Sequence, residues 1–377
     1  MHGLKSEYFM NTEELFLKLL AFRSITPDDD GAFSFIKAYL PSFKTIELEK
    51  EGVKNLFLYK EFGKGVHLCF AGHIDVVPPG EGWKREPFVP IVQEGVVYGR
   101  GTQDMKSGVC AFMQACKDVQ DFNGTLSMLL TSDEEGEAKY GTVEMLKHLK
   151  EIGFLPQCAI VAEPTSEVVF GDAIKVGRRG SINGVIELFG KQGHAAYPQK
   201  AINPVHQIAP LLSRLAGHLF DAGDASFEPT QMVITDIRGG MEVSNVTPGK
   251  LKMMFNVRNS TQTTLEDIRH YVDEVLQGLE YTLTLSQSAK PFVTTSEAFI
   301  VKAVEKALLH VKGVLPKRST AGGTSDARFF GEFGIPTIEC GVPNDTIHAP
   351  NECCKMDDVC DLAHVFSEVI TIVKESK

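Results

Sequence analysis

The sequence predicts an α/β protein, in which a doubly wound mixed sheet is interrupted by a smaller α+β domain. Up to about residue 175, short apolar runs typical of buried strands alternate with amphipathic helical segments. Between Ser181 and Leu285 the strands instead alternate apolar and polar residues, as half-exposed antiparallel strands do. The first pattern resumes at Ser296. We therefore expect one catalytic domain in two pieces, residues 1–175 and 293–377, with residues 176–292 inserted between them.

The first piece begins with a capped amphipathic helix, because Glu13 and Glu14 precede the apolar positions between Leu15 and Phe22. The elements after it follow from the same periodicities. In chain order they are a helix at 33–40, strands at 54–59 and 65–71, a helix at 108–119, a strand at 125–131, a helix at 142–149 and a strand at 158–162. Helices between buried strands are typical of parallel crossovers.

The inserted piece has the order β-α-β-β-α-β, which is the split βαβ arrangement. Its strands are expected at 181–189, 231–237, 250–257 and 281–285, and its helices at 204–219 and 265–279. The second catalytic piece then contains a helix at 296–311, a glycine-rich loop at 322–326, a helix through Phe330, a strand at 337–340 and a final helix at 359–374.

Composition excludes several classes of partner. Lys and Arg number 38 and Asp and Glu 49, so the net charge is −11, and no basic run offers a track for nucleic acid. No stretch approaches the ~18 consecutive apolar residues of a membrane-spanning helix. The eight cysteines form no C-x-x-C pair and suggest reduced thiols. Without the layout of a signal peptide, we expect a cytoplasmic protein with neither a nucleic-acid nor a membrane partner.

Potential metal ligands follow the apolar strands. The run Val66–Val77 contains His73 and Asp75, which are two apart and so share one side of an extended chain. Further potential ligands follow the later apolar runs. Because the carboxyl ends of parallel strands lie on one rim of a sheet, these side chains are expected to converge. The candidates beyond His73 and Asp75 are Asp104, Glu134, Glu135, Glu163 and His348.

Two imidazoles and three carboxylates match a two-metal hydrolytic site, with metals roughly 3.5–4 Å apart. Nitrogen and oxygen ligands without thiolates favour Zn²⁺, with Co²⁺ or Mn²⁺ as substitutes. Adjacent extended side chains point in opposite directions, so one of Glu134 and Glu135 can bind a metal while the other faces the attacking water. The alternative interpretations are a satisfied histidine at a strand end and an acidic surface patch.

Several motifs resemble those of the M20-type co-catalytic zinc amidohydrolases, a family that includes aminoacylases, acetylornithine deacetylase and carboxypeptidases. They are GHIDVVPPG at 72–80, YGRGTQDMKSG at 98–108, TSDEEG at 131–136 and AEPT at 162–165. The stretches 176–206, 321–330 and 347–352 are most similar to family members that remove a succinyl group. The similarity covers essentially the whole chain.

The resemblance implies a role for each candidate. His73 and Glu163 would bind one zinc, Glu135 and His348 the other, and Asp104 would bridge the two. Asp75 would fix the ring of His73, and Glu134 would be the general acid and base. In the inserted domain, His194 would reach across a homodimer interface and donate to the oxyanion. A glycine-flanked histidine is otherwise more often structural.

The implied substrate is a small N-acyl amino acid with carboxylates at both ends, namely an N-succinylated diamino dicarboxylate of lysine and diaminopimelate biosynthesis. Guanidinium groups bind carboxylates in bidentate fashion. The resemblance implies Arg178 and Arg258 as ligands of these carboxylates, whereas Arg179 is expected in a surface salt bridge. Further hydrogen bonds are expected from Asn245, Gly323, Thr324 and, because Asp345 stands where the family has an amide, Asn344.

Two other functions stay open at this stage. The first is a deacetylase or dipeptidase of the same family with another acyl pocket. The second is a non-catalytic metal-binding protein that kept the fold. Comparing N-succinyl with N-acetyl substrates distinguishes the first alternative, and loss of turnover on replacing Glu134 argues against the second. A dinucleotide-binding enzyme is disfavoured because no G-x-G-x-x-G follows a predicted strand.

Overall fold

The computed structural model describes residues 10–375, and the chain divides into two compact units. Of the described residues, the first unit comprises 10–176, 294–319 and 325–375. The second comprises 177–293 and the short segment 320–324. Each unit has its own hydrophobic core.

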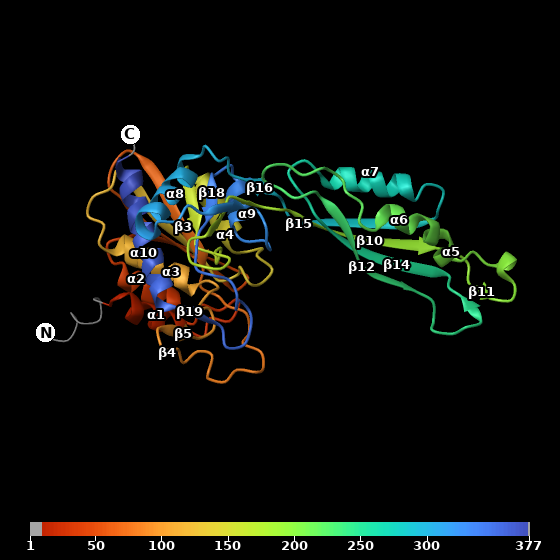
Figure 1. Cartoon of the computed structure of the whole chain (residues 1–377), viewed down its shortest axis with the longest axis horizontal. Coiled ribbons are helices and arrows are strands. Elements are labelled where there is room, and N and C mark those ends of the chain that lie inside the picture. Colours follow the sequence, from red (N-terminus) through yellow and green to blue (C-terminus); the bar gives the residue numbers. More distant parts are fainter. Residues whose placement is uncertain (1–9, 376–377) are drawn as a thin grey trace. The chain divides into compact units, whose positions relative to one another are not determined.

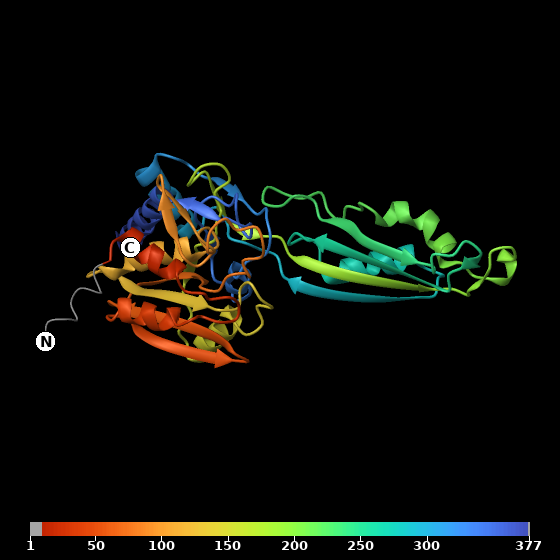
Figure 2. The ribbon, with the colours of Figure 1, turned by 90° about the horizontal axis from the view of Figure 1, so that it is seen from below.

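The first unit is built on an eight-stranded mixed sheet. Its strands, in spatial order, are β1 (Lys44–Lys50), β2 (Val53–Glu61), β6 (Gly124–Thr131), β3 (Val66–His73), β7 (Cys158–Val161), β18 (Thr337–Glu339), β8 (Ala173–Lys175) and β17 (Lys317–Ser319). The central strand β3 pairs in parallel with both β6 and β7. The pair β1 and β2, drawn in red-orange, is antiparallel and lies at one edge (Figure 2).

Helices cover both faces of this sheet, as a doubly wound fold requires. One group of helices packs together, namely α1 (Thr12–Leu20), α3 (Lys106–Lys117), α8 (Phe299–Lys312) and α10 (Met356–Glu375) (Figure 1). Phe70 of β3 faces this group, with ring centroids 5.9 Å from Phe112 and 5.1 Å from Phe366. His67, on the opposite side of the same strand, instead contacts Phe154. Helices α4 (Thr142–Glu151) and α9 (Ala327–Glu332) contact each other and the sheet, and α2 (Ala32–Tyr39) joins the first core.

A small three-stranded sheet also belongs to the first unit. It consists of β19 (Cys353–Lys355), β5 (Val96–Tyr98) and β4 (Ile91–Gln93), in that order. Cys354 of β19 lies opposite Val97 of β5. This pairing holds the segment after His348 beside the segment that leads to Asp104.

The second unit contains a four-stranded antiparallel sheet with helices on one face (Figure 1). Its order is β12 (Gln231–Gly239), β14 (Lys250–Arg258), β10 (Ser181–Phe189) and β15 (Tyr281–Ala289). Helices α5 (Pro204–Ile208), α6 (Leu212–Leu215) and α7 (Leu265–Val275) contribute to its core. Two short ribbons complete it, pairing β9 (Gly177–Arg178) with β16 (Phe292–Val293) and β11 (Gly193–His194) with β13 (Val246–Thr247). The α/β class with a mixed sheet and an α+β unit is confirmed.

Several elements differ from the sequence prediction, and the short strands β8, β17 and β19 were not predicted at all. The helix expected over 204–219 is interrupted by the 3-10 turn Ala209–Leu211, because Pro210 has no N–H to donate within a continuous α-helix. Strand β1 was missed because KTIELEK alternates only weakly and is largely exposed on both sides. Among residues 10–375 no helix is both long enough and apolar enough to cross a membrane.

Candidate active site

The carboxyl ends of three neighbouring strands bring the predicted ligands of the first unit together. In the parallel register of β3 and β6, His73 lies beside Thr131, and the acidic turn with Glu134 and Glu135 follows directly. On the other side, Ala71 of β3 lies beside Val161, two residues before Glu163. Side chains that are 60 to 90 residues apart in the sequence therefore share one rim of the sheet.

Asp104 lies between the two imidazoles. Its Oδ1 is 3.1 Å from Nε2 of His73, and its Oδ2 is 3.4 Å from Nε2 of His348. The same nitrogen of His348 is 3.0 Å from Oε1 of Glu135. Each carboxylate oxygen of Asp104 thus faces a different histidine, which is the arrangement that a bridging carboxylate requires.

Two glutamates complete the cluster around His73. Oε1 of Glu163 lies 3.7 Å and Oε2 of Glu134 lies 4.0 Å from Nε2 of the imidazole. The ligand atoms of His73, Asp104 and Glu135 lie within 4.8 Å of one another, and so do those of His73, Glu134 and Glu163. The five predicted metal ligands and Glu134 therefore meet in one place.

The titration behaviour of the histidines follows from this crowding. Burial lowers the pKa of His73, but the hydrogen bond to Asp104 and the nearby carboxylates outweigh burial and raise it well above its ordinary value. Hydrogen bonds to Asp104 and Glu135 raise the pKa of His348 to about 10. In the metal-free protein, protons on these rings supply the positive charge that the carboxylates demand.

The pKa values of the carboxyl groups shift in different directions. Burial would raise the pKa of Asp104, yet the hydrogen bonds to His348 and His73 hold it well below its usual range. Burial, followed by the neighbouring carboxylates, raises the pKa of Glu134 and of Glu163 well above the ordinary value. Asp326, a buried acid that sequence reasoning missed, is one of the charges that raise the pKa of Glu134.

These residues fit a pair of divalent cations. Oε1 of Glu163 is buried and has no hydrogen-bond partner within residues 10–375, which a cation in the cluster would provide. Ligand atoms around one tetrahedral ion, at about 2.0–2.2 Å from it, lie roughly 3.5 Å apart, and the observed separations of 3.0–3.7 Å match this spacing. The donors are nitrogen and oxygen only, as Zn²⁺ sites of hydrolases use.

Asp75 supports the cluster through both its main chain and its side chain. Its main-chain carbonyl accepts a hydrogen bond from Nδ1 of His73 at 2.8 Å, whereas its Oδ1 is 3.6 Å from that nitrogen. Its Oδ2 accepts hydrogen bonds from the Thr26 hydroxyl at 2.6 Å and from the Glu135 N–H at 3.1 Å. Asp75 therefore orients the ring of His73 and also fixes the turn that carries the two glutamates.

His194 lies in the second unit, on the short strand β11, and is exposed. Its Nδ1 accepts a hydrogen bond from the N–H of Ala196 at 3.1 Å. A neutral ring that accepts at Nδ1 carries its proton at Nε2, so the outward nitrogen is a donor. Asn245, which is also exposed, is a neighbour of this turn: its main-chain carbonyl accepts a hydrogen bond from the N–H of Ala195 at 2.9 Å.

The predicted substrate-binding arginines also belong to the second unit. Arg178 is buried, and its Nη1 donates to the carbonyl of Ala321 at 3.0 Å. A Cβ at Gly322 would lie 2.4 Å from this Nη1, and Gly322 has φ +106°, so only glycine fits beside the guanidinium. Arg258 is exposed on the surface. Its pKa is lowered first by the partial burial of its guanidinium group and second by the positive charge of Arg179.

The loops named from the sequence differ in exposure. In the segment 320–324, Gly323 is exposed and Thr324 is half-buried. Asn344 is half-buried in the first unit, and the neighbouring Asp345 accepts a hydrogen bond from Nε2 of Gln103 at 2.6 Å. Oε1 of Gln103 accepts from the N–H of Thr346 at 2.8 Å. The carboxylate at position 345 is thus engaged by the segment that leads to Asp104.

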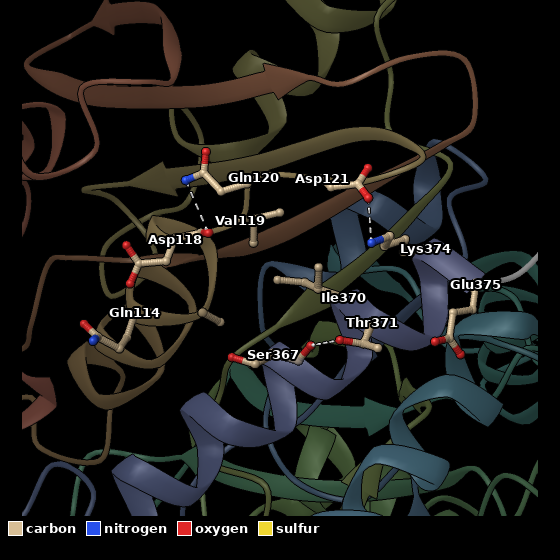
Figure 3. Close-up of a pocket in the computed structure, with 11 residues that line it drawn as sticks. Gln114, Asp118, Val119, Gln120, Asp121, Ser367, Ile370, Thr371, Lys374 and Glu375 are labelled. Carbon is tan, nitrogen blue, oxygen red and sulfur yellow. Dashed lines mark hydrogen bonds and ion pairs between the residues drawn. The ribbon is translucent and has the colours of Figure 1, made fainter.

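A hollow of about 500 Å³ elsewhere in the first unit contains none of these residues (Figure 3). It lies between the C-terminal end of α3 and helix α10, and an ion pair between Asp121 and Lys374 at 2.7 Å spans part of it. Its lining consists mostly of solvated polar side chains, including Gln114, Gln120 and Ser367. We assign it no function.

Comparisons with known proteins agree with this geometry. The family model described as peptidase family M20/M25/M40 matches residues 69–372. A succinyl-diaminopimelate desuccinylase of Nitratiruptor sp. is 60% identical over 361 residues, which cover 96% of this chain and 99% of that protein.

Two solved structures share the fold. A tripeptidase from Staphylococcus aureus superposes with a TM-score of 0.79 at 21% identity, covering 97% of this chain and 100% of that one. A dinuclear metal-binding peptidase of the M20 family from Bacillus subtilis has a TM-score of 0.71 at 14% identity, again covering 97% and 100%.

Proposed function

The chain belongs to peptidase family M20/M25/M40, and we propose that it is a succinyl-diaminopimelate desuccinylase with two zinc ions per subunit. It would convert N-succinyl-L,L-2,6-diaminopimelate and water to L,L-2,6-diaminopimelate and succinate. The observation that carries this proposal is the position of Asp104, with one carboxylate oxygen toward His73 and the other toward His348. The relative at 60% identity supports this substrate over those of a deacetylase or a dipeptidase.

In this proposal His73 and Glu163 would hold one zinc, Glu135 and His348 would hold the other, and Asp104 would contribute one carboxylate oxygen to each. When bound, the ions lower the pKa of water and polarise the amide carbonyl of the substrate. Co²⁺ or Mn²⁺ would substitute, because the donor set contains no thiolate that would select against them. The crowding of Glu134, Glu163 and Asp104 supports the need for cations, since the charge of Asp104 raises the pKa of both glutamates in the metal-free protein.

Glu134 is the general base and acid of the proposed reaction. It takes a proton from the attacking water while the water oxygen bonds to the amide carbon. The C–N bond then breaks, and Glu134 gives the same proton to the leaving amine. Its carboxylate reaches to 4.0 Å from Nε2 of His73, and Asp75 fixes its main chain through a hydrogen bond of 3.4 Å to its N–H.

His194 donates to the oxyanion that forms on the amide carbonyl. The tautomer that Ala196 imposes supports this role, because Nε2 carries the proton at the exposed end of the ring. We propose that His194 acts across a homodimer formed by the second unit. The edge strand β12 supports such an interface, since it carries the exposed apolar side chains Val233 and Ile237.

The substrate carboxylates are proposed to meet Arg178 and Arg258, with hydrogen bonds from Asn245, Gly323, Thr324 and Asn344. A chain of net charge −11 needs such local cations to hold a dicarboxylate. The unfavourable closeness of Arg258 to Arg179 supports an anion there, because a carboxylate would relieve the repulsion between the two guanidinium groups.

The test is an acyl-group comparison on the metal-loaded protein. We expect efficient hydrolysis of the N-succinyl substrate and little hydrolysis of N-acetyl analogues or dipeptides. Removing metal with a chelator should abolish turnover, and added zinc or cobalt should restore it. A clear preference for the acetyl substrate would favour a deacetylase, and full activity without metal would contradict the proposed site.

A further inference from the structure

We propose that Glu352 is a positioning residue for the metal site and, together with Arg100, fixes the loop that presents Asp104. The inference rests on the proposed function, because it requires that Asp104 and His348 are metal ligands. Neither Glu352 nor Arg100 belongs to the proposed ligand set, and both side chains are almost fully buried.

The Glu352 carboxylate organises the main chain that leads to Asp104. Its Oε1 accepts hydrogen bonds from the N–H groups of Gln103 at 2.8 Å and Asp104 at 3.2 Å. Its Oε2 accepts from the N–H of Gly101 at 2.9 Å and from Nη1 of Arg100 at 2.7 Å. Four donors converge on one carboxylate, and three of them are main-chain groups of the same short loop.

Arg100 connects this loop to two other segments of the site. Its Nη2 lies 3.3 Å from the carbonyl of His348 and 3.2 Å from the carbonyl of Pro79, which follows the His73 and Asp75 pair. The guanidinium carbon lies 5.2 Å from the ring centroid of Trp83. The Arg100–Glu352 pair therefore joins the backbone of one metal-binding segment to the backbones of two others.

This contact set requires an ionised carboxylate with two accepting oxygens. A glutamine has the same size, but its amide nitrogen is a donor and would face either Gly101 and Arg100 or Gln103 and Asp104. One pair of donors would lose its acceptor inside a buried site. The loop would then shift, and the two oxygens of Asp104 would no longer be held toward the two histidines.

Outer-shell partners of metal ligands typically contribute 10–100-fold to metal affinity. We therefore expect Glu352→Gln to weaken cobalt binding by about that factor in a folded protein, and Arg100→Lys to weaken it in the same direction. The Lys variant keeps the charge but loses the fork that reaches Glu352, His348 and Pro79 together. Arg100→Lys tests the inference on its own if Glu352→Gln does not fold.

The experiment uses the full chain, stripped with a chelator and reloaded with Co²⁺. Three quantities are measured: the cobalt stoichiometry and affinity against a competing chelator, the visible absorption band of bound cobalt, and the fluorescence of Trp83, the single tryptophan. We expect both variants to change the affinity, the cobalt band and the Trp83 emission. Val304→Ala, in the buried core at α8, is the control that lowers stability without touching the loop.

Each outcome is decisive. A weaker affinity with an altered cobalt band in the variants, but not in Val304→Ala, supports the inference. If the unmodified chain binds cobalt and both variants bind it equally well with the same band, the inference is wrong while the proposed function stands. If the unmodified chain binds no cobalt, the proposed function fails and the inference fails with it.

Discussion

The main-chain carbonyl of Asp75 lies 2.8 Å from Nδ1 of His73, closer than the Asp75 carboxylate, whose Oδ1 is 3.6 Å away. The ring is therefore held by the backbone two residues further along the strand end. The carboxylate is left to accept hydrogen bonds from the N–H groups of Glu134 and Glu135. One residue thus supports His73, a proposed metal ligand, with its main chain and the turn of Glu134 and Glu135 with its side chain.

Replacing Asp75 by Asn should separate these two roles. The main-chain carbonyl remains, so we expect metal content to stay near that of the unmodified protein. The amide cannot accept every hydrogen bond of the carboxylate, so kcat should fall on the order of 10–100-fold. Metal analysis beside steady-state kinetics checks this. Loss of one metal ion from the variant would instead mean that the carboxylate itself holds His73.

Glu134→Gln should abolish proton transfer while leaving the ligands intact. We expect kcat to fall by about 10²–10⁴-fold, the usual contribution of a general acid or base. Metal content and the unfolding temperature should change little. Glu137→Gln is the matched control, because Glu137 follows in the same acidic turn but is fully exposed. Turnover that survives in Glu134→Gln would refute its assigned role.

His194→Ala should bind zinc normally and turn over roughly 10²–10³-fold more slowly, as expected for one lost oxyanion donor. His206→Ala, an exposed histidine of the same unit, is the control. Mixing His194→Ala with Glu134→Gln should restore part of the activity if the histidine acts across a dimer. Absence of recovery after verified subunit exchange would contradict action in trans.

Metal binding should release protons. In the metal-free protein the pKa of His348 is raised to about 10 by Asp104 and Glu135, so at pH 7 the ring is protonated, whereas a metal ligand must be neutral. Each pH unit below 10 should therefore lower the apparent metal affinity, by up to about tenfold for this one proton. Cobalt titrations at pH 7 and pH 9 test this, and equal affinities at both would contradict the assignment of His348.

The stability of the metal-free protein should have the opposite pH dependence. Because the folded-state pKa of His348 is raised above its ordinary value of 6.5, the stabilisation is complete below that value and is lost as the pH rises through about 10. Unfolding temperatures of chelated protein between pH 7 and pH 10 should fall for this reason. His348→Asn should flatten the decline, and an unchanged slope in that variant would assign it to other groups.

The clustering of the strand-end residues could be predicted because each follows a buried apolar run. His73, Glu135 and Glu163 end up together because parallel register aligns the ends of β3, β6 and β7. The same reasoning predicts Asp104 and His348, but Asp104 follows the short strand β5 of the small sheet and His348 lies on a loop well beyond the end of β18. Their convergence requires the loop contacts that β5 and β19 organise.

Other features could not be predicted because they depend on distant contacts. Glu352 and Arg100 are 252 residues apart, and no local pattern distinguishes a buried glutamate after Asn351 from a solvated loop residue. His348 itself adopts φ +59°, a left-handed conformation that the histidine side chain does not signal in the sequence. Asp345 remains a departure from the family pattern, and its hydrogen bond with Gln103, 242 residues away, has no local signal in the sequence.

In the proposed reaction, the hydrogen bond between the Ala196 N–H and Nδ1 of His194 gives the two units of the chain different tasks. A ring whose inner nitrogen is committed to the backbone cannot pass a proton from one nitrogen to the other. If His194 acts as proposed, it therefore serves as a fixed hydrogen-bond donor, and the proton transfers of the reaction fall to Glu134 alone.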